Sequence, residues 1–577
     1  MFKLARYLKN YKKEVVFGPV FKLVEAILEL IAPLIMASII DVGIGNGDSG
    51  YIWRMGGLMI VIAAIGLVCA LICQYFAAKA SQGFGTDLRN ALFSHIGNLS
   101  HAEIDRFGTP SLITRMTNDI NQLQIAVAML IRLVIRAPFL IIGATVMAFL
   151  IDAKMAVIFL IAGAVIALVL YLVMSRSVPF YRAIQKLLDR VSLVTRESLS
   201  GARIIRAFSK QKKEKERFDE TADEVQRAAV RVGKISALLN PLTYLIVNIA
   251  IVAILWFGGG AVNTGQLEQG QIIALVNYMT QIMLALVVVA NLVVIFTKAS
   301  AAGTRVSEVL ETEAGVSDTG NRFQMEAENG KPEIEFEHVT FSYGGGEAEL
   351  KDISMKIYAG QTVGIIGGTG AGKSTLVNLI PRFYDADHGS VLVGGVNVKD
   401  YPFSQLRGKI GLVPQKAVLF SGTVRENMRW RDPNATDAEI DAALQVAQAY
   451  EFVEKMPRKL DTVILQGGKN LSGGQRQRLT IARALVGDPQ ILILDDSASA
   501  LDFATDAKLR RAIREFGRRI TVLMVSQRVS TVKTADKIIV MDDGEIVGVG
   551  THDELFETNE IYREICLSQL KESGVRQ

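Results

Sequence analysis

The chain has 577 residues, of which 50% are hydrophobic, with a mean hydropathy of +0.29 and a formal net charge of +5. This apolar content is too high for an ordinary soluble enzyme of that length, and no motif indicates nucleic-acid binding. The three cysteines, Cys69, Cys73 and Cys566, form neither a disulfide framework nor a metal cluster by number or spacing.

Six apolar runs between residues 15 and 300 are each long enough to cross a bilayer as a helix, and the chain from about residue 305 onward reads as a soluble α/β protein. Buried helices of a soluble bundle would not reach this number and length. We therefore expect a multidomain chain: an all-α domain of six transmembrane helices with long cytoplasmic helical extensions, followed by an α/β domain. The six runs lie near residues 15–42, 52–80, 124–151, 155–177, 238–260 and 270–298.

The connections between these runs alternate in length and charge. Those after the first, third and fifth runs are short, whereas 80–123 and 178–237 are long and basic. Lysine and arginine collect on the cytoplasmic side of a cell membrane, so both termini and the soluble domain are expected in the cytoplasm. The first run is too long for the apolar region of a signal peptide, so no cleavable signal is expected.

Both long connections have helical periodicity, which predicts that the membrane helices continue beyond the bilayer. The first connection contains a break at Gly108 and Pro110, and the second contains a turn at Gly201. Each break by itself indicates no more than a cytoplasmic turn.

Three charged residues, Lys22, Glu25 and Glu29, lie within the first apolar run. Their spacing places them near one helix face, with Glu25 on the order of 15 Å from the cytoplasmic end. A carboxylate at that depth is costly unless it faces water or a partner. Two interpretations stay open: the glutamates line a polar cavity for cationic substrates, or they form ion pairs with Lys22, Arg132 or Arg136.

The polar, acidic stretch 303–332 ends the apolar part of the chain and is expected to be a helix end and linker. It includes Gly320 and Glu326. The predicted domains are thus 1–302 in the membrane and, after this linker, 333–577, which opens with the alternating pattern of a strand.

A glycine-rich loop lies between a β-branched run that ends at Ile366 and an apolar stretch, 376–380, typical of a helix. Strand, G-x-x-x-x-G-K-[ST] loop and helix in this order predict a phosphate-binding loop, because glycines let consecutive backbone N–H groups face phosphate oxygens. We expect Lys373 to reach the β- and γ-phosphates of a nucleoside triphosphate and Ser374 to bind Mg²⁺. The nucleotide-binding residues of this loop are Gly367, Gly368, Thr369, Gly370, Ala371, Gly372, Lys373, Ser374 and Thr375.

Two further motifs follow the loop. The apolar stretch 491–494 ends at Asp495, the pattern of a buried strand whose carboxylate holds the Mg²⁺ that bridges the β- and γ-phosphates. Between the loop and this strand lies a glycine turn before a helix, formed by Leu471, Ser472, Gly473, Gly474 and Gln475.

With these motifs the chain resembles the ATP-binding cassette (ABC) exporters over essentially its whole length. The domain order is that of a half-transporter, with the membrane domain first and an α/β P-loop cassette second. Leu471 to Gln475 match the signature motif of that family. The resemblance implies that ATP and Mg²⁺ are bound, and that two half-transporters form a dimer in which each ATP lies between one chain's phosphate-binding loop and the other chain's signature.

The resemblance also implies roles for residues outside these motifs. Tyr343 stands where the family stacks an aromatic ring on adenine, and Gln415 matches the glutamine that contacts Mg²⁺ and faces the membrane domain. Ser499 to Asp502 match the loop that crosses to the opposite subunit. The segments around 111–115 and 201–208 resemble the coupling regions through which closure on ATP reorients the membrane cavity.

Three positions depart from the family pattern. The family has a glutamate that polarises the attacking water where this chain has Asp496, whose carboxylate is withdrawn by roughly 1–1.5 Å. Because a misplacement of about 1 Å can slow a reaction about 10²-fold, Asp496 is expected to be a poor base. Gln527 replaces the switch histidine that contacts the γ-phosphate, and Gln466 replaces an acid implicated in coupling between domains.

The residues expected to bind the nucleotide match the family pattern, whereas those expected to assist ATP hydrolysis differ from it. The chain therefore resembles the degenerate-site subunit of a heterodimeric exporter. The expected function is ATP-driven export of amphipathic or drug-like compounds across a lipid bilayer, with this chain lending its signature to the active site of a second half-transporter. The alternatives are a homodimeric lipid or peptide exporter and a regulatory nucleotide-sensing subunit. The cargo stays open, since the aromatic residues of the apolar runs suit a cavity and helix packing equally: Phe139, Tyr244, Tyr278 and Phe296.

Overall fold

The computed structural model describes residues 2–318, 331–497, 501–516 and 520–574. Parts of two predicted segments lie outside these ranges: Gly320 and Glu326 of the predicted linker, and Ser499 and Ala500 of the predicted crossing loop.

The chain divides into two compact units. The helical unit comprises residues 1–96 and 110–311, and the sheet unit comprises residues 97–109 and 312–577. The helical unit contains six helices long and apolar enough to cross a membrane among the residues that the structure describes, which confirms the expected all-α membrane domain.

The elements of the helical unit follow one another with short breaks or local π-helical turns. They are η1 (Phe2–Tyr11), α1 (Lys12–Ser38), η2 (Ile39–Ile44), α2 (Ser49–Asn98), α4 (Thr109–Thr114), η3 (Arg115–Asp119), α5 (Ile120–Met129), η4 (Leu130–Val134), α6 (Arg136–Ile151), α7 (Ala153–Ser200), α8 (Ala202–Ala207), α9 (Gln211–Ala237), α10 (Leu239–Asn263) and α11 (Gln269–Glu311).

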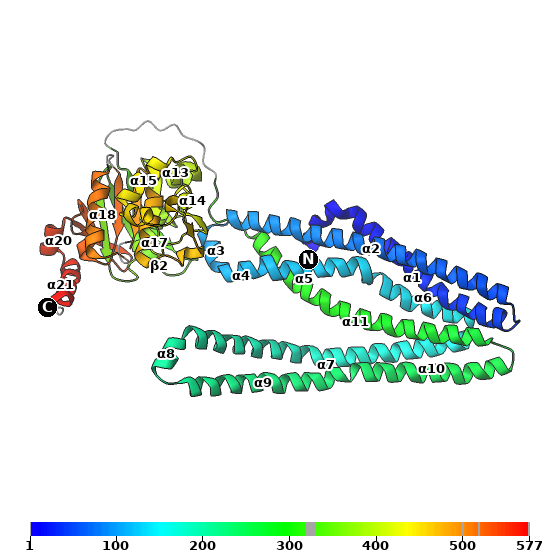
Figure 1. Cartoon of the computed structure of the whole chain (residues 1–577). Helices are drawn as coiled ribbons and strands as arrows, with labels where there is room; N and C mark the ends of the chain where they lie inside the picture. The colour runs from blue at the N-terminus through cyan, green and yellow to red at the C-terminus, as the bar shows by residue number, and fades with distance from the viewer. Residues whose placement is uncertain (1, 319–330, 498–500, 517–519, 575–577) are drawn as a thin grey trace. The chain divides into compact units, whose positions relative to one another are not determined.

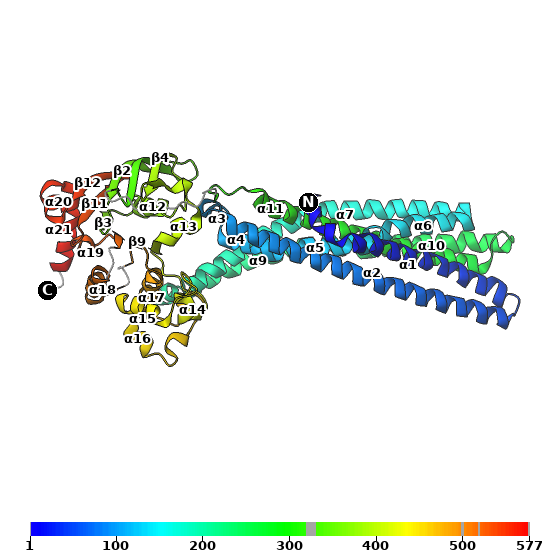
Figure 2. The ribbon, with the colours of Figure 1, turned by 90° about the horizontal axis from the view of Figure 1, so that it is seen from above.

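The long helices extend well past the apolar runs, as their periodicity predicts. The helix α7 packs along α9 and α10, and the short helix α8 turns the chain between α7 and α9 (Figure 1). In the view turned by 90°, α6, α7 and α10 again lie in one bundle (Figure 2). Fully buried alanines, among them Ala26, Ala144 and Ala274, let the helix backbones approach closely.

The helix α11 does not end where the polar composition begins. It continues through Gly303 to Glu311 and so occupies the first part of the predicted linker 303–332. The reason is that Val306 and Val309 keep one face of the helix buried, while the neighbouring Arg305 and Glu308 form ion pairs. The Arg305 guanidinium donates to both carboxylate oxygens of Asp119, and Glu308 accepts from Arg115 at 2.8 Å.

The sheet unit has three sheets with helices around them, the α/β architecture that the sequence predicts. The central sheet has the order β12-β11-β3-β10-β9-β6, in which β12 is antiparallel to β11 and the other neighbours are parallel. A four-stranded antiparallel sheet, β2-β1-β4-β5, and the pair β7-β8 complete the unit.

The strands of the sheet unit are short and mostly buried. They are β1 (Ile334–Ser342), β2 (Ala348–Ile357), β3 (Thr362–Gly367), β4 (His388–Val393), β5 (Val396–Asn397), β6 (Ile410–Val413), β7 (Gly422–Thr423), β8 (Val463–Ile464), β9 (Ile491–Asp495), β10 (Thr521–Val525), β11 (Lys537–Asp542) and β12 (Glu545–Gly550).

Short helices surround these sheets, and five of them, α3, α14, α15, α17 and α20, begin with a serine or threonine capping box. All the described helices of the sheet unit are α3 (His101–Phe107), α12 (Lys373–Leu379), η5 (Val398–Asp400), α13 (Phe403–Lys409), α14 (Val424–Met428), α15 (Asp437–Val446), α16 (Tyr450–Glu454), η6 (Lys459–Asp461), η7 (Gln466–Gly468), α17 (Gly473–Leu485), α18 (Phe503–Glu515), α19 (Val529–Val532), α20 (His552–Thr558) and α21 (Glu560–Gly574).

The helix α3 belongs to the sheet unit although it lies between the first membrane helices in sequence. The His101 ring stacks on Phe383 with 4.3 Å between ring centroids, and the Tyr384 hydroxyl donates to Asp105 at 3.1 Å. The coupling segment predicted at 111–115 is therefore placed too far along the chain. Those residues belong to the helical unit, because the break at Gly108 separates α3 from α4 and leaves the docking side chains before it.

The contact of His101 predicts that α3 is less firmly bound in acid. Burial lowers the pKa of His101 below its ordinary value of about 6.5, so bound α3 holds fewer protons than released α3. Binding should be complete above about pH 6.5 and weaken as the pH falls below it. Hydrogen–deuterium exchange of residues 97–109, corrected for intrinsic rates, should accelerate over that range, and His101→Phe, which keeps a stacked ring, should abolish the acceleration. An equal acceleration in the phenylalanine variant would contradict this account.

Candidate nucleotide site

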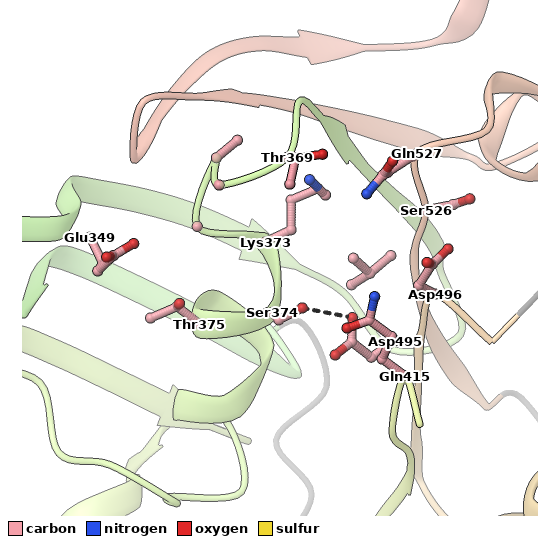
Figure 3. A pocket seen from close by; sticks show the side chains of 14 residues that line it. Glu349, Thr369, Lys373, Ser374, Thr375, Gln415, Asp495, Asp496, Ser526 and Gln527 are labelled. Atoms are coloured by element: carbon pink, nitrogen blue, oxygen red, sulfur yellow. Dashed lines mark hydrogen bonds between the residues drawn. The ribbon is translucent and has the colours of Figure 1, made fainter. Parts of the chain in front are cut away.

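The functional candidates of the sheet unit meet where four neighbouring parallel strands end. The strands β3, β10, β9 and β6 lie side by side in that order. Glycine loop 367–372 follows β3, Gln527 follows β10, Asp496 follows β9 and Gln415 follows β6. Because the carboxyl ends of parallel strands share one edge of a sheet, side chains from distant parts of the chain line one pocket there (Figure 3).

The glycine loop needs glycine at positions where the backbone takes left-handed angles. Gly370 has φ of 85° and Gly372 has φ of 82°, and a Cβ on Gly372 would lie 2.7 Å from the carbonyl oxygen of Glu349. L-residues rarely adopt this conformation, and a side chain would displace β2 from the loop. The loop can therefore keep its N–H groups at the pocket only with glycine at position 372.

Lys373 is held inside this loop. Its ammonium donates to the carbonyl oxygen of Gly367 at 3.0 Å and to that of Gly368, and the residue is only 8% exposed. Burial lowers the pKa of Lys373, and the nearby carboxylates of Asp496 and Asp495 oppose that shift. The contacts orient the ammonium so that it faces the pocket from the loop side (Figure 3).

Ser374 and Asp495 form the side of the pocket suited to a cation. The Ser374 hydroxyl donates to Asp495 Oδ1 at 3.0 Å, and Gln415 lines the same pocket. Burial raises the pKa of Asp495, and the hydrogen bond from Ser374 opposes that rise. A hydroxyl, a carboxylate and an amide oxygen are hard ligands that fit Mg²⁺, which in nucleotide sites takes its other ligands from phosphates and water.

Asp496 and Gln527 line the pocket opposite the glycine loop (Figure 3). Asp496 has φ of 44°, and its N–H donates to the carbonyl oxygen of Val525 at 2.9 Å. The left-handed turn brings the carboxylate to Gln415, with which it forms a hydrogen bond. Burial raises the pKa of Asp496, while this hydrogen bond and the charge of Arg528 lower it.

Tyr343 does not line this pocket, although the resemblance placed it on adenine. Its hydroxyl lies 3.2 Å from the Thr375 hydroxyl, and its ring packs edge-on against Tyr384 and Phe341. Thr375 follows the glycine loop, so the ring lies beside the pocket with 44% of the residue exposed. Sequence reasoning did not find Glu349, whose backbone closes the loop from β2, because no motif marks it.

The signature residues also lie outside this pocket, at the start of α17. Ser472 caps the helix by accepting from the Gln475 N–H at 3.2 Å, and the Ser472 N–H donates to Gln475 Oε1 at 2.9 Å. Leu471 precedes the cap, and the first turn begins with Gly473, which is exposed, and Gly474, which is half-buried. An exposed helix N-terminus of this kind can bind a phosphate of another molecule.

The two glutamates of α1 lie in ion pairs within the helical unit. The Lys22 ammonium lies 2.7 Å from Glu25, and the Arg136 guanidinium donates to Glu29 at 2.6 Å. The neighbouring Gln281 amide donates to the Glu29 carbonyl oxygen. These contacts favour the second interpretation of the sequence, in which the carboxylates balance cations of the chain.

Comparison with known proteins agrees with the arrangement of both units. The family model for the ABC transporter transmembrane region matches residues 15–286, and a second family model, described as ABC transporter, matches residues 350–499. An uncharacterised ABC transporter ATP-binding protein of Mycobacterium bovis is 38% identical over 98% of this chain and 97% of its own length. The chain therefore belongs to the ABC transporter family, as a half-transporter with fused membrane and ATP-binding domains.

Other relatives align over nearly the whole chain. An uncharacterised ABC transporter ATP-binding protein of Bacillus subtilis is 37% identical over 100% of this chain and 99% of its own. A protein of Yersinia pestis named as an ATP-dependent lipid A-core flippase is 31% identical over 96% of this chain and 95% of its own. A solved bacterial Atm1-family ABC exporter with ATP bound has the same fold, with a TM-score of 0.79, 23% identity and coverage of 97% of this chain and 98% of that one. The protein is thus a membrane-bound, ATP-driven ABC exporter that binds ATP with Mg²⁺.

Substitution of the constrained glycine tests the geometry of the loop. Gly372→Ala should lower ATP affinity at least about tenfold, because the strained backbone and the contact with Glu349 would open the loop. Gly368→Ala is the matched control, since a Cβ there meets nothing within 4 Å. Equilibrium binding of a fluorescent ATP analogue measures both variants, and equal affinities would show that the loop tolerates a Cβ at either position.

Proposed function

We propose that this exporter chain is the weakly hydrolytic half of a heterodimer that expels amphipathic or drug-like compounds. Its own site binds Mg-ATP through Lys373, Ser374 and Asp495 but hydrolyses it slowly. Its signature completes the hydrolytic site of a second half-transporter. Both termini and the sheet unit lie in the cytoplasm, which the basic character of the two long connections supports.

The position of Asp496 carries this proposal. A base must lie within hydrogen-bond reach of the water that attacks the γ-phosphate, and the Asp496 side chain, which lines the pocket beside Gln415, is one methylene shorter than the glutamate of the family. Gln527 can donate a hydrogen bond but cannot take up a proton, so it can hold a phosphate without assisting the transfer. By contrast, two residues proposed to bind Mg-ATP are held in place by hydrogen bonds: Lys373 to the Gly367 carbonyl oxygen and Ser374 to Asp495.

The free signature supports the second half of the proposal. Residues 471–475 do not line the chain's own pocket, and the start of α17 is exposed. A triphosphate held by another half-transporter could therefore be bound there by the helix N-terminus. One site with a glutamate and a histidine would then hydrolyse ATP while the other retains it.

An apolar groove in the helical unit supports an amphipathic cargo. It runs between η4 with α6 and the later part of α11, and its lining includes Leu130, Val134, Pro138, Val289 and Phe296. Of the other aromatic candidates, Tyr278 is fully buried and donates to the Leu30 carbonyl oxygen at 2.6 Å, which is a packing role. The groove has few polar groups, as a site for an apolar chain or ring requires.

A homodimeric lipid exporter is the second candidate, and the name of the Yersinia relative favours it. In that assembly Asp496 would act as a slow but sufficient base at two equal sites. A purely regulatory nucleotide sensor is less consistent with six membrane helices and an apolar groove.

Restoring the family residues distinguishes the two assemblies. In the full-length chain purified alone, Asp496→Glu together with Gln527→His should raise ATP turnover about 10-fold to 100-fold, because the carboxylate regains its reach. Lys373→Ala in the same background controls for contaminating ATPase. A wild-type chain that already turns over rapidly, and loses that turnover in Asp496→Asn, would refute the weakly hydrolytic site and favour the homodimer.

The ion pairs of α1 predict a structural rather than a cargo-selective effect of substitution. Glu29→Gln would leave the Arg136 guanidinium unpaired within the membrane-spanning part, which costs several kcal/mol in a bilayer. We expect a lower melting temperature and equal losses in transport of cationic and neutral compounds, with recovery in the double variant Glu29→Gln, Arg136→Gln. A selective loss of cation transport with unchanged stability would instead assign Glu29 to the cargo site.

A further inference from the structure

The last helix of the chain is attached to the loop that carries Gln527. Gln569, on α21, donates from Nε2 to the carbonyl oxygen of Gln527 at 2.7 Å and accepts from the Val529 N–H at 2.9 Å. One side-chain amide thus holds the backbone on both sides of Arg528. The orientation of the amide is fixed, because a carbonyl oxygen needs the NH₂ group and an N–H needs the oxygen.

The contact with Gln569 is one of several hydrogen bonds that hold the loop carrying Gln527. On its upstream side, the Ser526 N–H donates to the Ile365 carbonyl oxygen at 3.1 Å, which attaches the loop to β3 of the central sheet. On its downstream side, Val529 begins α19, a helix of 4 residues whose first N–H has no partner within the helix. Gln569 supplies that partner and so caps α19 from another element.

The helix α21 is itself firmly held. Tyr562 and Cys566 are buried, and they lie on the same helix face as Gln569 by their spacing. The Tyr562 hydroxyl lies 2.8 Å from Nδ1 of His552 on α20, and the Arg563 guanidinium donates to the Phe556 carbonyl oxygen at 2.8 Å. Figure 2 shows α19, α20 and α21 together beside β11. The amide therefore connects the loop to a rigid element.

We propose that Gln569 is a positioning residue for the nucleotide site, which sets where the Gln527 side chain meets the γ-phosphate. The proposal rests on the proposed role of Gln527 as the residue that contacts this phosphate. Gln569 touches no nucleotide itself. Substitution of Gln569 should weaken the contact between Gln527 and the γ-phosphate, which ATP has and ADP lacks. The contacts with adenine, ribose and the β-phosphate should stay unchanged.

The experiment compares affinities for adenylyl imidodiphosphate, a non-hydrolysable ATP analogue, and ADP in the full-length chain. The readout is the ratio of the ADP and analogue dissociation constants. Gln527→Ala should lower this ratio about tenfold to a hundredfold, the loss expected for one hydrogen bond to a charged group. Gln569→Leu should lower it by a similar factor, and the double variant should lose no more than the larger single loss.

Two further variants keep the test decisive. Gln569→Glu has nearly the same volume and can still accept from Val529, but its second oxygen would face the Gln527 carbonyl oxygen. It should lower the ratio at least as far as Gln569→Leu and replaces that variant if leucine prevents folding. Ser568→Ala, whose hydroxyl bonds only within α21, is the matched control and should leave the ratio unchanged.

The outcomes separate this inference from the proposed function. If Gln527→Ala lowers the ratio and neither Gln569 variant does, the positioning role is overturned and the role of Gln527 stands. Equal losses of analogue and ADP binding in the Gln569 variants would reduce Gln569 to a purely structural residue and also overturn the inference. If Gln527→Ala itself leaves the ratio unchanged, both the role of Gln527 and the inference built on it fail.

Discussion

The nucleotide chemistry of this exporter depends on one constraint, the meeting of four parallel strand ends at one edge of the central sheet. The backbone ladders of β3, β10, β9 and β6 set the register of residues that are far apart in sequence. Val525 pairs with both Asp495 and Ile365, so the loop that carries Gln527, the carboxylate proposed to bind Mg²⁺ and the glycine loop are placed by the same hydrogen bonds. A shift in that ladder would disassemble the site as a whole.

The local chemistry of each strand end then decides what the site can do. The glycine loop is fixed by backbone that only glycine can adopt, and Lys373 and Ser374 are held by hydrogen bonds within the unit. By contrast, Asp496 and Gln527 occupy the positions where a longer carboxylate and an ionisable ring would serve hydrolysis. In the function proposed above, tight binding with slow hydrolysis would follow from that combination, and such a subunit would support a partner's cycle through its signature.

Much of this could be predicted from the sequence, because phosphate binding needs a fixed order of residue types. Strand, glycine loop and helix are local in sequence, and so is a buried strand that ends in Asp495. The six membrane helices follow from the length of their apolar runs. Predictions failed where a contact joins distant segments. The docking helix α3 lies before the Gly108 break and not after it, and nothing local marks His101 as the partner of Phe383.

Other features were beyond the sequence for the same reason. Two charged residues of the predicted linker, Arg305 and Glu308, are ion-paired on a continuous helix, which only the positions of Asp119 and Arg115 reveal. The spacing of Glu29 allowed a cargo site or an ion pair, and the choice depended on where Arg136 lies. Gln569 belongs to no motif, since its importance comes from the backbone groups that it bonds.

The most direct test asks whether the nucleotide held by this chain keeps its γ-phosphate. The full-length chain is loaded with photoreactive ATP labelled at the γ-phosphate, incubated with Mg²⁺ at working temperature for increasing times, and then crosslinked. If the site binds well and hydrolyses slowly, the label should remain on the chain for many times the interval of one ordinary exporter cycle. Loss of the label within a single cycle, with the adenine still bound, would contradict the account.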